Sequence, residues 1–252
     1  MALKETYEKQ GNFLFRWRSF LPLLIGPLLI LVFFDSQYTK RLFGEHFDSF
    51  WGAFCVAVSF AGFFVRCLVA GYVPSGTSGR NTKSQIAESL NTRGMYSMVR
   101  NPLYLGNYLI VLGLLLFTQV WWFVLVGTAI FWIYYERIIF AEEAFLRDKF
   151  GDTFMKWAEN TPVIIPDFSK WESPELTFSV KNVLKREFNG FFAIIATITA
   201  LHVIENVVTE KSFQTKYYIS ETWEAFFLTG LAIYLILWFL KKFTRLLKVE
   251  GR

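Results

Sequence analysis

The sequence predicts an all-α fold, a multi-pass bundle of about six transmembrane helices, and three observations support this class. Hydrophobic residues make up 54% of the 252 residues, which is more than a soluble domain of this length normally carries. The apolar residues are gathered in long blocks nearly free of charge, not spaced along one face of an amphipathic helix. Finally, a chain in lipid must satisfy its backbone hydrogen bonds internally, which favours helices.

Six apolar blocks are long enough, with flanking turns, to cross a bilayer core that requires about 20 helical residues. The first block follows Arg16 and Arg18 and contains Pro22 and Pro27. It is not followed by a convincing cleavage site, so we interpret it as a retained helix and not as a signal peptide. The blocks cover residues 19–34, 50–73, 103–117, 120–135, 188–208 and 225–240.

A turn near Thr118 and Gln119 is predicted to divide the uncharged run 103–135 into a helical hairpin. With this turn and a cytoplasmic N-terminus, 20 Lys and Arg residues lie inside the cell and four outside, whereas a single crossing gives 10 and 14. The positive-inside tendency therefore favours the hairpin. Both termini are then expected in the cytoplasm, and a bacterial source would imply the cytoplasmic (inner) membrane.

The chain is predicted to divide into a core of four spans (residues 1–166), a linker (167–187) and an accessory pair of spans (188–252). The linker is predicted from the prolines and polar residues between Pro162 and Lys181. The net charge of +5 follows from the topology and does not indicate nucleic-acid binding. Because Cys55 and Cys67 lie in one apolar block, we expect neither a disulfide nor a metal site.

The first polar motif opens the third block and reads Arg100-Asn101-Pro102-Leu103-Tyr104-Leu105-Gly106. Pro102 suits the first turn of a helix, so Arg100 and Asn101 are expected at the mouth of the span. The free N–H groups of a helix N-terminus attract anions, and a guanidinium adds a bidentate donor. This end of the span is therefore predicted to bind a carboxylate or phosphate, with Tyr104 as a flat face and Gly106 allowing close backbone approach.

The second motif, Glu142-Glu143, lies just beyond the fourth span. Adjacent helical residues differ by about 100° around the axis, so one carboxylate can face a pocket while the other orients a neighbour. A cationic ligand group would be their natural partner. The alternative is that Glu143 pairs with Arg147 one turn on, while Glu142 is solvated and Arg100 anchors the span in the interface.

Together the motifs R-x-P-x-Y-x-G and E-E-x-x-L, followed by F-G and P-x-x-x-P, resemble the superfamily of isoprenylcysteine carboxyl methyltransferases and phospholipid methyltransferases. The resemblance covers Gly94 to Pro166, and residues 76–100 also look like a bacterial branch that methylates the 1-phosphate of lipid A. It implies S-adenosylmethionine at the cytoplasmic ends of the spans and a lipid-embedded methyl acceptor. The implied catalytic residues are Arg100, Asn101 and Glu143, and the implied cofactor contacts are Tyr96, Arg100, Asn101, Pro102, Tyr104, Leu105, Gly106, Glu142 and Glu143.

This sequence departs from the common pattern of the superfamily, which has His where Asn101 stands. An amide donates and accepts hydrogen bonds but does not exchange a proton near neutral pH. An acceptor that is already anionic, such as a phosphate or carboxylate oxygen, needs no base and is therefore favoured. Candidate contacts to the substrate head group are Arg66, Arg80 and Arg137, with a snorkelling Arg66 and a solvated connector around Arg80 as the alternatives.

The predicted function is S-adenosylmethionine-dependent methylation of the polar head of an amphiphilic lipid, at a phosphate oxygen. The expected partners are therefore the bilayer and a membrane lipid. Two alternatives stay open: carboxyl methylation of an isoprenylated cysteine, and a transporter or structural membrane protein with a degenerate motif. Transporters tend to show internal repeats and interrupted midplane helices with buried charge, signs that are weak in this sequence.

Overall fold

The computed structural model describes residues 3–18, 26–74, 87–209 and 219–249, and every regular element within these ranges is helical. Four helical segments there are long and apolar enough to cross a membrane, and one further apolar helix is shorter. These findings confirm the predicted class of multi-pass helical bundle. The elements are α1 (Leu3–Trp17), α2 (Gly26–Tyr72), α3 (Met95–Met98), α4 (Pro102–Phe117), α5 (Trp121–Phe150), α6 (Asp152–Asn160), the 3-10 helix η2 (Phe168–Lys170), α7 (Val180–Thr209) and α8 (Glu221–Phe243).

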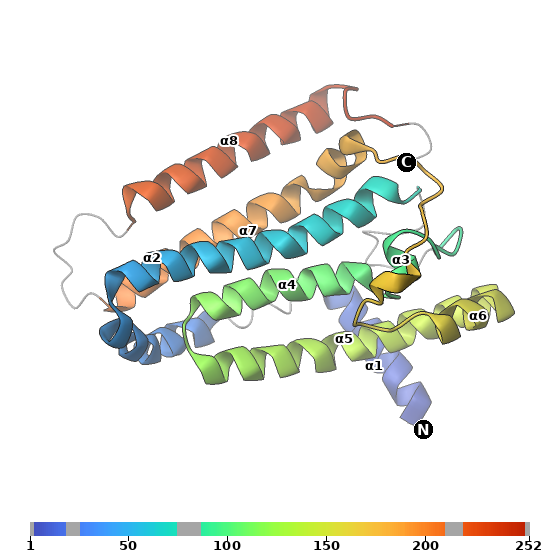
Figure 1. The fold of residues 1–252 in the computed structure, drawn as a ribbon, viewed down its shortest axis with the longest axis horizontal. Coiled ribbons are helices and arrows are strands. Elements are labelled where there is room, and N and C mark those ends of the chain that lie inside the picture. The colour runs from blue at the N-terminus through green and yellow to red at the C-terminus, as the bar shows by residue number, and fades with distance from the viewer. Residues whose placement is uncertain (1–2, 19–25, 75–86, 210–218, 250–252) are drawn as a thin grey trace.

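The long helices run side by side along the bundle (Figure 1). α2 packs between α4 and α7, α5 packs on α4, α8 packs on α7, and α1 packs on α5. We call the end at which α4 begins and α5 finishes the motif end, because both sequence motifs lie there. The opposite end, where α4 is joined to α5, is the hairpin end.

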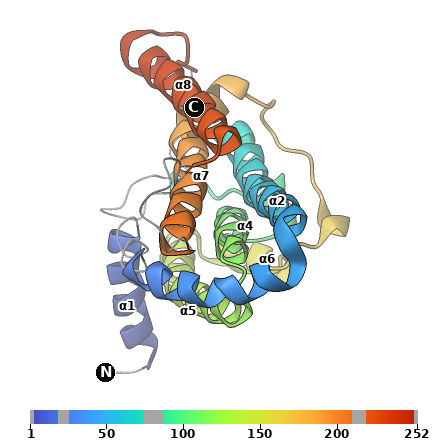
Figure 2. The same cartoon turned by 90° about the vertical axis from the view of Figure 1, so that its left-hand side faces the viewer.

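α2 is one continuous helix from Gly26 to Tyr72, where the sequence had predicted two spans separated by an outside loop. The prediction of a loop between residues 34 and 50 was therefore wrong. No proline occurs between Pro27 and Pro74, so nothing in this stretch blocks the helical hydrogen bonds. Figure 2 shows the N-terminal part of α2 crossing the hairpin end before the helix turns to run along α4.

The N-terminal part of the chain reaches both ends of the bundle. Phe15 of α1 packs at the motif end, in a cluster with Tyr104 and Ile138. Val32 packs at the hairpin end, in a cluster with Leu115 and Phe123. The chain therefore passes from one end to the other between residues 15 and 32, although part of the first predicted span, residues 19–25, lies outside the described ranges.

The hairpin between the third and fourth apolar blocks turns where the sequence predicted it. α4 ends at Phe117, α5 begins at Trp121, and Gln119 has a positive φ of 57°. The Thr118 hydroxyl donates to the carbonyl of Leu115 at 2.7 Å, which satisfies one of the free carbonyls at the helix end. The two polar ends of the hairpin consequently lie on the same side of the bundle.

Close contact between α2 and α4 depends on two glycines that face each other. A Cβ added at Gly62 would lie 2.4 Å from the carbonyl oxygen of Gly106, and one added at Gly106 would lie 2.8 Å from Cγ of Arg66. Neither position can hold a larger residue without moving a helix. This crossing brings the guanidinium of Arg66 to the side of α4 inside the bundle.

The predicted linker is shorter than the sequence suggested. α7 begins at Val180, so residues 180–187 of the predicted linker are helical and only residues 161–179 lie between α6 and α7, with η2 among them. The buried side chain of Asn182 donates to the carbonyl of Ala70 at 2.7 Å, which fastens the start of α7 to the end of α2. The division of the chain into a core and an accessory pair stays a prediction.

Candidate active site

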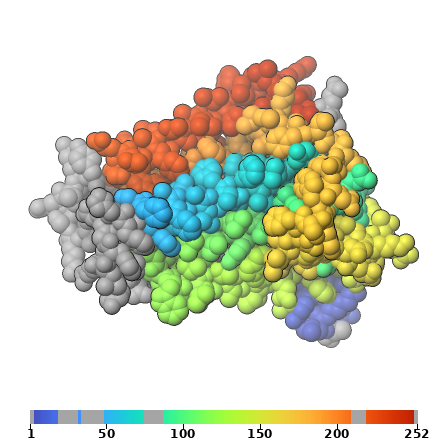
Figure 3. Space-filling view, in the orientation of Figure 1, coloured from blue at the N-terminus to red at the C-terminus, as the bar shows by residue number. Residues whose placement is uncertain are grey.

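Residues 161–179, here called the strap, fold back over the motif end and hold it together. The strap accepts a hydrogen bond from the backbone N–H of Gly94 at the Glu172 carbonyl, and Asp167 donates its own N–H to Met98. The hydroxyl of Ser97 accepts the N–H of Glu172 at 2.9 Å. In the space-filling view the strap, in gold, covers this face of the molecule (Figure 3). The two prolines of the P-x-x-x-P motif belong to the strap.

Arg100 and Glu143 meet at the motif end although 43 positions separate them in the chain. Nη1 of Arg100 donates to Oε1 of Glu143 at 2.8 Å, and the two side chains are 17% and 23% exposed. The ion pair joins the two motifs across the α4–α5 hairpin. Arg147, one turn beyond Glu143, is exposed. The alternative in which Glu143 merely pairs along its own helix is therefore not what the structure shows.

The guanidinium of Arg100 keeps hydrogen-bonding capacity beyond this pair. Its Nε is buried, and within the described part of the chain no acceptor lies in hydrogen-bonding range of it. A buried donor without a partner is costly, so the site favours a ligand that brings an acceptor. The backbone N–H of Arg100 is already taken by the carbonyl of Pro162 at 2.8 Å, which fixes the start of α4 to the strap.

Asn101 and Pro102 form the entrance to α4 as predicted. Pro102 occupies the first turn and Asn101 precedes it as the N-cap residue, with no hydrogen bond from its side chain to the helix. The side-chain amide of Asn101 donates instead to the carbonyl of Val163 in the strap, at 3.1 Å. The residue that replaces the usual His thus helps to position the strap, and its Oδ1 remains able to accept.

Tyr104 brings the second acidic residue into the site. Its side chain lies close to the carboxylate of Glu142, and its ring lies 4.6 Å from that of Tyr135, centroid to centroid. Gly106 faces α2 and serves helix packing, whereas Leu105 is half-buried next to it. Of the motif, the side chains of Arg100 and Tyr104 therefore lie against the paired acids.

Two residues outside the core motifs lie within electrostatic range of Glu142. Tyr96 of α3 accepts the indole N–H of Trp157 at its carbonyl, and burial raises the pKa of its phenol above the ordinary value, so it stays neutral at physiological pH. Arg18 lies within electrostatic range of Glu142 and Tyr104. In the sequence, Arg18 is recognisable only as a residue that flanks the first predicted span.

Arg66 is held by two partners inside the bundle. Its Nε and Nη2 donate to the two oxygens of Glu187 on α7, at 2.9 and 3.1 Å, and its Nη1 donates to Oδ1 of Asn107 on α4, at 2.6 Å. Glu187 is buried, at 5% exposure of its side chain. The guanidinium is therefore paired inside the bundle and is not a snorkelling anchor, and its contact with a head group stays a prediction.

Arg137, another predicted head-group contact, lies on the side of α5 that packs against α1. The guanidinium of Arg137 stacks on the ring of Tyr7, 3.5 Å from its centroid, and pairs weakly with Glu136 at 3.8 Å. It faces α1 and helps to hold that helix on α5. Arg80 lies outside the described residues.

Sequence reasoning missed Glu187, Asn107 and Tyr135, which are linked to Arg66 by hydrogen bonds inside the bundle. Nδ2 of Asn107 donates to the hydroxyl of Tyr135 on α5, at 3.3 Å. A polar residue inside an apolar block was the available signal for Asn107, because such groups are usually paired in membranes. No such signal existed for Glu187, which the sequence placed in a polar linker.

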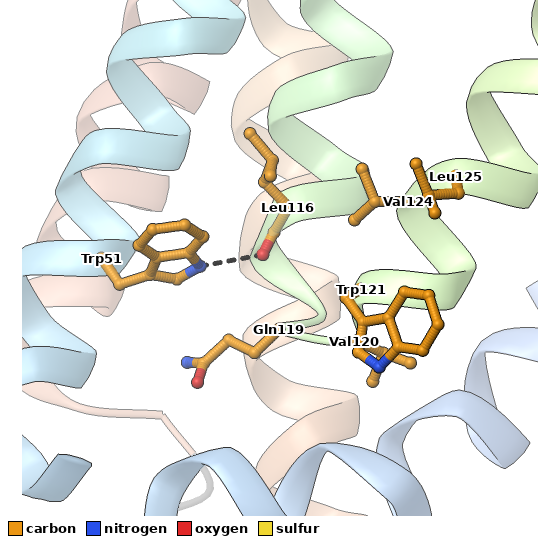
Figure 4. A pocket seen from close by; sticks show the side chains of 7 residues that line it. All are labelled: Trp51, Leu116, Gln119, Val120, Trp121, Val124 and Leu125. Atoms are coloured by element: carbon orange, nitrogen blue, oxygen red, sulfur yellow. Dashed lines mark hydrogen bonds between the residues drawn. The ribbon is translucent and has the colours of Figure 1, made fainter.

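A separate groove lies at the hairpin end, about 520 Å³ in volume. Figure 4 shows it between Trp51 of α2 and the start of α5, with the indole of Trp51 donating to the carbonyl of Leu116 at 2.9 Å. None of the described residues that line it is charged, so these residues do not suit a zwitterionic cofactor. Its lining consists of Trp51, Leu116, Gln119, Val120, Trp121, Val124 and Leu125.

Fold and site together define an integral membrane protein with an acidic and basic cluster at one end of a helical hairpin. Residues 75–153 match the family model described as phospholipid methyltransferase. The chain is also 28% identical over 158 residues to the protein-S-isoprenylcysteine O-methyltransferase of Schizosaccharomyces pombe, an alignment that covers 58% of this chain and 66% of that relative. Both matches support the superfamily of phospholipid and isoprenylcysteine methyltransferases, and they confirm the resemblance seen in the motifs. No solved structure matches the chain.

Proposed function

We propose that this protein is an integral membrane methyltransferase that uses S-adenosylmethionine to methylate the polar head of an amphiphilic lipid, at a phosphate oxygen. The observation that carries the proposal is the ion pair between Arg100 and Glu143. It brings together the two halves of a motif set typical of membrane methyltransferases, and it does so next to Glu142 and Tyr104.

The residues of the motif end suit the chemistry of this cofactor. S-adenosylmethionine carries a carboxylate, an ammonium and an adenine, and when bound it supplies a methyl group on a sulfonium sulfur that leaves as a neutral thioether. Arg100, with its unpartnered buried Nε, would hold the carboxylate. Glu142 and Glu143 would hold the ammonium, and the aromatic face of Tyr104 would lie against the adenine.

Each of these charge-assisted hydrogen bonds is worth about 1.5 to 3 kcal/mol, so the loss of any one should be visible in cofactor affinity. Binding also requires that Arg100 and Glu143 exchange part of their contact with each other for contacts to the cofactor. The strap would help by fixing the backbone of Arg100 and the amide of Asn101. The protein's contribution to the transfer itself is alignment in a dry site, which can supply several kcal/mol.

The choice of acceptor rests on Asn101, which stands where the superfamily commonly has His. Its amide does not exchange a proton near neutral pH. An oxygen that is already anionic can attack the methyl carbon with its own electron pair, and no proton has to move. This chemistry favours a lipid phosphate over the ammonium of phosphatidylethanolamine, which would first have to be deprotonated.

A second candidate function is methylation of an isoprenylated cysteine at its carboxylate. The match to the protein-S-isoprenylcysteine O-methyltransferase of Schizosaccharomyces pombe favours it specifically. A prenylcysteine carboxylate is also an anionic oxygen on a lipid tail, so it suits the same site equally well.

One experiment separates these candidates. Purified protein is incubated with methyl-labelled S-adenosylmethionine and either a total membrane lipid extract or N-acetyl-S-farnesylcysteine. Label in a phosphate-bearing lipid is the expected result, and label only in the farnesylcysteine would establish the second candidate. If the protein neither binds the cofactor nor labels either substrate, it is not a methyltransferase.

A further inference from the structure

The relay of buried and half-buried polar groups from Glu187 to Tyr135 has no role in the cofactor site described above. It links four helices in sequence, from Glu187 on α7 through Arg66 on α2 and Asn107 on α4 to Tyr135 on α5. Such groups are expensive inside a membrane and usually mark a functional site.

The direction of every hydrogen bond in this relay is fixed by its first members. An arginine side chain has only donors, so the Asn107 atom that contacts Arg66 must be its carbonyl oxygen. The amide nitrogen of Asn107 then faces Tyr135 and must donate, and the tyrosine oxygen must accept. This assignment follows from the chemistry of the guanidinium, so it does not depend on how the amide oxygen and nitrogen of Asn107 were placed.

Tyr135 is consequently left with its own proton to donate. None of the described residues accepts it: the remaining contacts of this side chain are ring contacts with Tyr104, Phe131 and Tyr134. The adjacent Tyr134 differs in this respect, because its hydroxyl donates to the carbonyl of Leu14 at 3.1 Å. The relay therefore presents one oriented donor inside the bundle.

We propose that the Tyr135 hydroxyl donates a hydrogen bond to the acidic head group of the methyl acceptor. Glu187, Arg66 and Asn107 keep this hydroxyl oriented so that its proton points to the head group. Tyr135 is seven residues before Glu142 on the same helix, which is about 10 Å deeper along its axis. A ligand group at that depth belongs to a molecule embedded in lipid. An acidic oxygen there requires a donor, since an unpaired charge is costly in a dry environment.

This inference rests on the proposed function and adds to it the residue that recognises the acceptor. Phosphate and carboxylate heads present the same anionic oxygen, so both are covered by the proposal. An amine head is not covered, because an ammonium offers donors and no acceptor to a tyrosine proton.

The test measures binding of two lipids, phosphatidic acid and N-acetyl-S-farnesylcysteine, by native mass spectrometry of the full-length protein. Removing the hydroxyl with Tyr135→Phe keeps the ring contacts and should weaken binding of the recognised lipid about tenfold or more. Tyr134→Phe is the matched control and should bind as the wild type does. Affinity for S-adenosylmethionine should change less than about twofold in both.

Asn107→Asp tests the orientation of the relay directly. A carboxylate at this position would accept from both Arg66 and Tyr135, so it would turn the tyrosine proton away from the acceptor without removing any side chain. It should therefore weaken lipid binding as Tyr135→Phe does, and the double variant should be no weaker than either single variant.

Three results would overturn the proposal: wild-type affinity in Tyr135→Phe, a loss confined to the cofactor, or no binding of either acidic lipid by the wild type. The failure of the proposed function looks different, because it would appear in the wild type as absent cofactor binding or absent methyl transfer. Thermal unfolding of each variant identifies any that is misfolded. If Tyr135→Phe is misfolded, Asn107→Asp serves as the test, and the reverse also holds.

Discussion

Replacing Glu143 with Gln should weaken the binding of S-adenosylmethionine while leaving the fold intact. The carboxylate is 23% exposed and lies 2.8 Å from Arg100, so it is shielded from water but close to the bundle surface. Gln keeps the length of the side chain and an oxygen that can accept from Arg100, but it loses the negative charge that would bind an ammonium. The lost interaction is of the charge-assisted kind, worth about 1.5 to 3 kcal/mol.

That free energy corresponds to an affinity about 10- to 150-fold lower, since about 1.4 kcal/mol is a factor of ten. Isothermal titration with the cofactor in lipid nanodiscs measures it. Glu136→Gln is the control, because Glu136 also lies on α5 but is 65% exposed, pairs with Arg137 and stands about two turns away from Glu143. If Glu143→Gln and Glu136→Gln both bind within about twofold of the wild type, the acids of the second motif do not hold the cofactor.

Three further predictions concern the framework of the site and its pH dependence. Gly106→Ala places a Cβ 2.8 Å from Arg66 and should lower the free energy of unfolding by about 1 to 3 kcal/mol, as measured by thermal unfolding. Gly52→Ala is the control and should be nearly neutral, because its Cβ would have its nearest contact at 3.6 Å. Equal effects of the two substitutions would contradict close packing at Gly106. Ser97→Ala removes the acceptor for the Glu172 N–H, a hydrogen bond worth about 1 kcal/mol, and should speed tryptic cleavage at Lys170 roughly fivefold. Unchanged cleavage would show that the strap does not depend on this hydrogen bond. Because Asn101 does not titrate, the rate of methyl transfer should vary less than about threefold between about pH 7.5 and 9, and a tenfold rise per pH unit would reveal a general base.

The fold class and the position of the hairpin could be predicted from the sequence, because both depend on patterns that are local in the chain. Charge-free blocks indicate spans, and the charge balance of the loops indicates where the run 103–135 must turn. The continuity of α2 could not be predicted in the same way. Its charged residues between 35 and 48 resemble those of a loop, but they interrupt no backbone hydrogen bond, and only proline would have ended the helix.

The candidate site, too, could be predicted from the sequence only where it depends on local patterns. Arg100, Asn101, Tyr104, Glu142 and Glu143 could be proposed from two short motifs, and the structure brings the guanidinium and the acids together. The relay depends on which faces of α2, α4, α5 and α7 turn toward one another, which a single sequence does not specify.

The Gly62–Gly106 crossing sets the first of these contacts, between α2 and α4. It places Arg66 beside Asn107, and Glu187 joins the pair because α7 begins at Val180, eight residues before the predicted start at Phe188. Arg137 was proposed as a head-group contact because it stands near the second motif; it packs on Tyr7, and its role toward a head group stays a prediction.

The most direct test of the account is an experimental structure of the protein in nanodiscs with S-adenosylhomocysteine, the product left after methyl transfer. The account predicts density for the ligand at the motif end, with its carboxylate at Arg100 and its ammonium at Glu142 or Glu143. Density in the groove beside Trp51 and Leu125, or no ordered ligand at saturating concentration, would contradict it.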